Sequence, residues 1–133
     1  MVRNAAAAAC GLVLLCGVAA GCGTGQREAA AEAAAEDFLG ALDRGDAAAA
    51  CASLSPETAE ELTASEGEAC EEALGAQGLT GGPVGEVAVW GDRAQVRTDA
   101  DVLFLAELDD GWKVVAAGCA PQGEKPYRCE VGG

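Results

Sequence analysis

The pattern of hydrophobic and polar positions divides the chain into an apolar start, a helical half and a strand half. Residues 5–20 form one apolar run. From Glu28 onward apolar residues recur at spacings of three and four, which predicts helices. After Pro83 they alternate with polar residues, which predicts strands. Helices followed by an antiparallel meander predict an α+β domain in which the helices cover one face of the sheet.

Capping residues divide the helical half into four predicted helices. Gly45 ends the first, and Asp46 is a favourable N-cap for the second. Ser55 followed by Pro56 is a typical start for the third, with Ser as N-cap and Pro at the first helical position. The predicted helices begin at Glu28, Ala47, Pro56 and Glu68, and a stretch rich in glycine, 75–83, ends this half.

The strand half predicts an antiparallel sheet of four to five strands. The predicted strands cover residues 84–90, 93–98, 102–108 and 112–118, with a short fifth at 127–131. Turn residues separate them, most clearly Asp109-Asp110-Gly111, which is a hairpin signal. We expect residues 119–126 to form a loop.

The start of the chain has the layout of an export signal. A short basic segment precedes the apolar run, and that run is shorter than the roughly 20 residues that a membrane span needs. It closes on Ala19-Ala20-Gly21-Cys22, which resembles a bacterial lipobox. We therefore expect residues 1–21 to be a lipoprotein signal, Cys22 to carry the lipid, 22–27 to be a flexible tether and 28–133 to be one domain. The alternative is an ordinary secretory signal that leaves Cys22 as a spare thiol.

Four cysteines remain once the signal and the lipidated residue are set aside. An even number in an oxidising compartment predicts two disulfides. Local closure loses the least loop entropy and favours Cys51–Cys70 and Cys119–Cys129. The crossed pairings, which would join the helices to the sheet, remain the alternative.

The charge of the chain excludes several classes of partner. The formal net charge is −14. Arg3 is the one charged residue before Cys22, so the chain from Cys22 onward would carry one negative charge more. Such a surface repels nucleic acid and anionic lipid headgroups. The acidic helical half is either a solvated face or a docking face for a cationic partner.

The absence of His removes the commonest acid–base catalyst and zinc ligand, and we expect no cofactor and no bound transition metal.

Two short segments resemble the nuclear-transport-factor-2-like superfamily, whose members are also called cystatin-like or SnoaL-like. Residues 35–46 (Ala-Glu-Asp-Phe-Leu-Gly-Ala-Leu-Asp-Arg-Gly-Asp) are similar to its opening helix, and residues 108–115 (Leu-Asp-Asp-Gly-Trp-Lys-Val-Val) are similar to its late hairpin. The resemblance implies a cone-shaped domain, in which N-terminal helices pack on a curved antiparallel sheet that wraps a helix and leaves a pocket, here in a small lipoprotein of actinobacterial type. Its enzymes place Asp, His or Tyr in that pocket. This chain has no His and one Tyr, so no catalytic residue is carried over.

The candidate site residues are few. Trp90, Phe104 and Trp112 could line a pocket for an apolar ligand, or could simply belong to the core. Carboxylates at two turns, Asp99 with Asp101 and Asp109 with Asp110, could bind Ca²⁺ or act as acid and base, although Asp is ordinary turn chemistry.

The strand over 102–106 is apolar on both faces and needs cover on each. Helices cover one face, and the other is either an interface for a protein partner or a second copy, or is covered by the tail 119–131. We therefore expect an extracytoplasmic, membrane-anchored binding lipoprotein rather than an enzyme. The rival is an isomerase or hydratase that uses an Asp on an apolar substrate. A carboxyl with a raised pKa in a closed apolar pocket would favour the enzyme, and a filled core would favour the binding domain.

Overall fold

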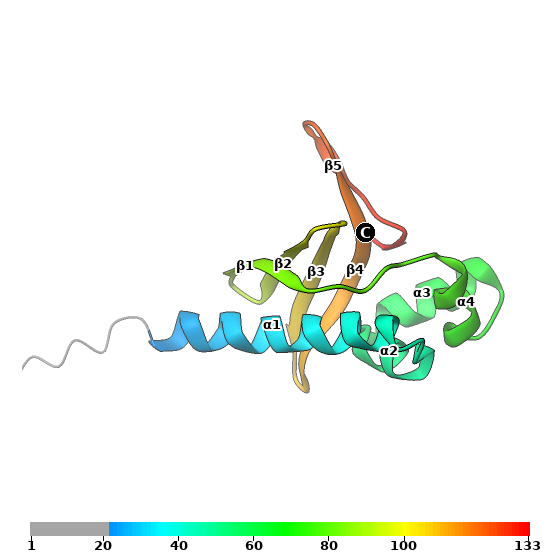
Figure 1. Ribbon diagram of the computed structural model, residues 1–133, viewed down its shortest axis with the longest axis horizontal. Coiled ribbons are helices and arrows are strands. Elements are labelled where there is room, and N and C mark those ends of the chain that lie inside the picture. Colours follow the sequence, from blue (N-terminus) through cyan, green and yellow to red (C-terminus); the bar gives the residue numbers. More distant parts are fainter. Residues whose placement is uncertain (1–21) are drawn as a thin grey trace, which may run out of the picture.

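The computed structural model describes residues 22–133, over which four helices precede six strands (Figure 1). The helices are α1 (Cys22–Asp43), α2 (Ala47–Ser53), α3 (Pro56–Glu66) and α4 (Cys70–Ala76). The strands are β1 (Val84–Trp90), β2 (Arg93–Thr98), β3 (Val102–Leu108), β4 (Gly111–Gln122), β5 (Lys125–Arg128) and β6 (Val131–Gly132). The predicted α+β class is confirmed, and the predicted export signal lies outside the described residues.

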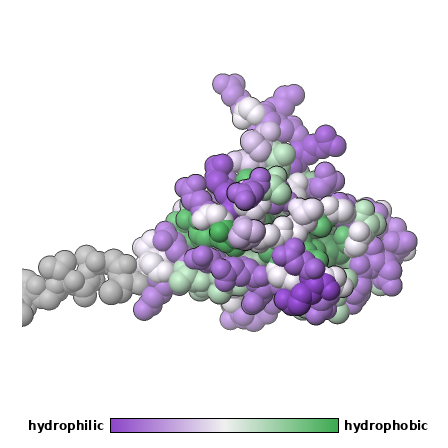
Figure 2. Space-filling view, viewed as in Figure 1, coloured by the Kyte–Doolittle hydropathy of each residue, from purple (hydrophilic) through white to green (hydrophobic). Residues whose placement is uncertain are grey.

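The strands form one antiparallel sheet in the order β1-β2-β3-β4-β5, and β6 also pairs with β4. The sheet has one strand more than the four to five expected. The loop predicted over 119–126 is wrong, because β4 continues to Gln122 and turns back at Gly123 into β5. This hairpin projects beyond the rest of the sheet in Figure 1, and its projecting end is hydrophilic in Figure 2.

Helix α1 crosses the sheet and contacts β1, β2, β3 and β4 (Figure 1). It begins at Cys22, so residues 22–27, for which a flexible tether was predicted, are helical in the structure. Arg27 explains the difference, because its guanidinium donates hydrogen bonds to Glu107 and to the carbonyl of Gly91, and lies 5.7 Å from the centre of the Trp112 ring. These contacts hold the first turns of α1 against the sheet.

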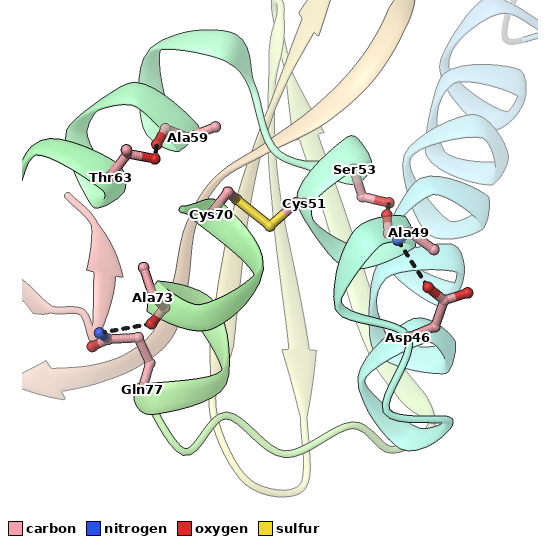
Figure 3. Close-up of a disulfide and its surroundings, with 9 residues drawn as sticks. All are labelled: Asp46, Ala49, Cys51, Ser53, Ala59, Thr63, Cys70, Ala73 and Gln77. Carbon is pink, nitrogen blue, oxygen red and sulfur yellow. Dashed lines mark hydrogen bonds between the residues drawn. A yellow bond between two sulfur atoms is a disulfide. The ribbon is translucent and has the colours of Figure 1, made fainter. Parts of the chain in front are cut away.

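The short helices are ordered by caps and by a disulfide. As predicted, Asp46 caps α2 by accepting a hydrogen bond from Ala49 N at 3.1 Å. Figure 3 shows the disulfide between Cys51 of α2 and Cys70 of α4. Because α2 has few large side chains, a covalent link replaces the packing that a richer core would supply. Both disulfides of the favoured pairing, including Cys119–Cys129, are present in the structure.

The main core lies between the helices and one face of the sheet. The helices supply Phe38 and Leu39 of α1 together with many buried Ala residues. The sheet supplies Leu103, Leu105 and Val114, each 1 % exposed or less. In the part of the chain that the structure describes, no helix is long and apolar enough to cross a membrane.

Candidate functional site

Strand β3 is apolar on both of its faces, and the two faces meet different surroundings. Leu103 and Leu105 point into the main core beneath the helices. The alternate residues Phe104, Ala106 and Leu108 point to the opposite face, because successive side chains of a strand alternate. All three of these residues line an open groove of about 870 Å³.

Small side chains beside Phe104 make the floor of this groove. Phe104 is in register with Gln95 of β2 and with Ala116 of β4. The register of β3 and β4 shifts between Phe104 and Leu105, which leaves Val115 as an extra residue on β4. Because Ala106 and Ala116 reach only a short distance above the backbone, the sheet is hollowed between the larger side chains around them.

The first turn of α3 forms one wall. Two hydrogen bonds attach this turn to β4. Ser55 N donates to the carbonyl of Val114 at 2.9 Å, and the Thr58 side chain donates through Oγ1 to the carbonyl of Val115 at 3.1 Å. The Ser55 hydroxyl also caps the helix by accepting from Thr58 N at 3.1 Å. The predicted cap therefore positions a wall of the site, and places Glu57 and Glu61 along its rim.

The end of the chain forms the second wall, with Pro126, Tyr127 and Cys129 lining the groove. Tyr127 meets Phe104 edge to face, with ring centres 5.1 Å apart, and Gln95 Nε2 donates to Tyr127 Oη at 3.2 Å. The Cys119–Cys129 disulfide joins this wall to β4. The tail thus covers part of the open face, as one of the two expectations had it, but it leaves the groove beside it accessible.

Exposed apolar side chains concentrate on this face. Within residues 22–133, the two exposed large hydrophobic residues are Trp90, which is 50 % exposed, and Leu108, which is 37 % exposed. Leu108 lines the groove. Trp90 is in register with Arg93, which is in register with Ala106, so Trp90 lies on the same face at the outer strand. Exposed apolar surface of this kind is typical of an interaction site.

The three aromatic residues predicted to share a pocket are not brought together. Phe104 lines the groove. Trp112 lies on the opposite face of the sheet, 8 % exposed, within the main core. Trp90 lies at the edge of the sheet and does not line the groove. The sequence indicated the tail 119–131 as possible cover for this face, but it did not indicate the first turn of α3, because its approach to the sheet depends on the path of distant segments.

Among the candidate carboxyls, Asp101 has the environment most similar to the one that an Asp-dependent enzyme would need. Burial raises the pKa of the Asp101 carboxyl above its ordinary value, and a hydrogen bond from Thr98 Oγ1 at 3.1 Å partly opposes that rise. Asp101 borders an apolar depression lined by Phe38, Leu42 and Leu79. That depression has no space for a water-sized molecule, so a substrate would have no place beside the carboxyl.

The remaining predicted carboxylates lie at turns. Asp99 is in the turn between β2 and β3, and Asp109 and Asp110 are in the turn between β3 and β4, all three exposed. The exposed Asp110 carboxylate lies 3.6 Å from Nζ of the partly buried Lys113. Within residues 22–133, no three His, Cys, Asp or Glu side chains are grouped so that they could hold a metal ion.

Comparison of the chain with protein-family models, with curated proteins and with solved structures finds no match. The resemblance to nuclear-transport-factor-2-like domains therefore stays a prediction, and the groove is the feature from which a function is argued.

Proposed function

We propose that this protein is an extracytoplasmic lipoprotein, anchored in the cell membrane by lipid on Cys22, whose single domain binds a protein or small ligand through the open face of its sheet. The observation that carries the binding proposal is the groove of about 870 Å³ with an apolar floor. Binding sites are typically concave and largely apolar, with a few charged groups that orient the ligand. Arg93, Glu57 and Glu61 supply such groups at the rim.

The anchoring proposal is supported by the sequence that precedes the domain. A basic start, a short apolar run and small residues before Cys22 fit a lipoprotein signal. Helix α1 begins at Cys22, so the lipid would be attached at the first residue of a helix that lies against the sheet. The domain would then sit close to the bilayer, with the groove open to the extracytoplasmic space.

A binding domain fits the geometry better than the rival enzyme. The raised pKa of Asp101 is the observation that an Asp-dependent isomerase or hydratase would need. The depression beside it has no space for a water-sized molecule, and the groove of about 870 Å³ on the other face is not lined by Asp101.

The anchoring part is tested on protein from the native host. Mass spectrometry should find an N-terminus at a lipid-modified Cys22, and the protein should partition with membranes. Cys22→Ala should release the domain or block its maturation, whereas Cys16→Ala, a control within the removed segment, should change neither. A free Cys22 thiol or an uncleaved start would refute the anchor.

The binding part is tested by placing a photo-crosslinking amino acid at Leu108, in the groove. Glu32 is the control position, because it is exposed on α1 and does not line the groove. On intact cells we expect a defined adduct, to a protein or to a small molecule, from position 108 and none from position 32. No adduct, or the same adducts from both positions, would contradict a binding site in the groove.

A further inference from the structure

The groove does not end at α3. A second hollow of about 250 Å³ lies beside it, and Glu61 and Gly133 line both. The groove and this hollow therefore form one continuous surface that runs from β3, past the start of α3, to the last strand. A ligand that lies along the groove would extend into the hollow.

The two parts differ in chemistry. Three glutamates, Glu61, Glu66 and Glu130, line the hollow, and no Lys or Arg is among its lining residues. These carboxylates are not grouped closely enough within residues 22–133 to hold a metal ion. Carboxylates accept charge-assisted hydrogen bonds from the ammonium group of Lys or the guanidinium group of Arg, so the hollow suits a basic side chain.

The apolar part is elongated along β3. Phe104, Ala106 and Leu108 are spaced by two residues, so their row extends about 13 Å along the strand. An extended polypeptide presents side chains with the same period of two. A compact small molecule would fill only part of this length and would leave the acidic hollow without a role.

We propose that the groove and the hollow together bind an extended segment of a partner protein that carries apolar or aromatic side chains followed by a Lys or Arg. The apolar side chains lie over Phe104 and Leu108, and the basic side chain enters the hollow between Glu61, Glu66 and Glu130. Arg93 is in register with Ala106 and also lines the groove, so its charge disfavours a basic side chain over the apolar floor. The inference rests on the proposed binding function and names its partner class.

The test uses the full protein purified from its host with both disulfides intact, and a phage-displayed library of random twelve-residue peptides. The selected peptides should combine apolar residues with Lys or Arg. Their affinity should fall about tenfold in the triple variant Glu61→Gln, Glu66→Gln and Glu130→Gln, since three charge contacts are lost. The control triple Glu32→Gln, Glu36→Gln and Glu72→Gln changes net charge equally at exposed positions outside both hollows and should alter affinity less than about twofold.

A second variant tests the apolar part. Ala106→Phe places a large side chain in the floor of the groove and should abolish peptide binding, and near-ultraviolet circular dichroism checks that the fold is kept. Enrichment of acidic peptides, no enrichment, equal losses in the two triple variants or unchanged binding by Ala106→Phe would each overturn the proposal. If position 108 crosslinks to a small molecule while the library yields nothing, this inference fails and the proposed binding function stands. If both experiments are negative, both fail.

Discussion

The two faces of strand β3 are built from similar residues and lead to opposite outcomes. On the helix side Leu103 and Leu105 are 1 % exposed or less, and α1 covers them. On the other side Leu108 is 37 % exposed and faces the groove. Hydrophobicity alone does not distinguish these leucines. The difference is whether another element covers the face, which separates side chains that stabilise the fold from side chains available for binding.

The two faces also differ in how they are covered. On the covered face, the helices pack against the sheet, and the depression beside Asp101 has no space for a water-sized molecule. On the open face, cover comes only from the tail and from the first turn of α3, each held by a few specific links. A face covered by a few links can keep its shape and still offer space to a ligand.

The largest expected effect comes from the same substitution made on each face. Leu105→Ala should lower the free energy of unfolding by about 2–5 kcal/mol, because it leaves a cavity in the main core. Leu108→Ala should change it by less than about 0.5 kcal/mol, because that side chain is partly in water. Urea unfolding measures both. Equal losses would show that the open face contributes as much to stability as the covered face does, which would contradict the proposed difference between the two faces.

The two disulfides are expected to contribute similarly to stability and differently to binding. Replacing Cys51 and Cys70 by Ala should lower the free energy of unfolding by about 3 kcal/mol in the chain-entropy model, with groove binding unchanged. Replacing Cys119 and Cys129 by Ala should cost nearly as much although the separations are 10 and 19 residues, because the loop entropy depends only on the logarithm of loop length. It should also weaken crosslinking at position 108, since Tyr127 then loses its anchor. Similar crosslinking in both variants would show that the tail wall stands without its disulfide.

The smallest expected effect concerns Asp101 beside the covered face. Its raised pKa in the folded state means that ionisation opposes folding, so its contribution to stability is lost as pH rises from the ordinary Asp value of about 3.9 through the raised one. Asp101→Asn should therefore raise the melting temperature at pH 7, and the difference should vanish at about pH 3. The exposed turn residue Asp99→Asn is the control and should show no such trend. A lower melting temperature for Asp101→Asn at pH 7 would contradict the assignment.

Much of the local structure followed from the sequence. The residues of β1, β2 and β3, the cap at Asp46 and the start of α3 after Ser55 were predicted because each depends on near neighbours in the chain. Period-two alternation, capping side chains and turn residues act over a few positions. The favoured disulfide pairing is also present, because it joins cysteines that are close in sequence.

What the sequence left open involves contacts between distant segments. The early start of α1 goes with Arg27 reaching Glu107, 80 residues away. The extension of β4 depends on pairing with β5, and the groove depends on Ser55 and Tyr127 meeting strands far from them in the chain.

The sequence by itself therefore determined the α+β class, the boundaries of β1, β2 and β3, and an apolar strand that needed cover on both sides. Only the tertiary structure decided which face is covered and which is open. It sent Trp112 into the core, Phe104 into the groove and Trp90 to the edge. The physical reason is that alternation assigns a side chain to one of two faces, whereas the cover on each face depends on where the rest of the chain packs.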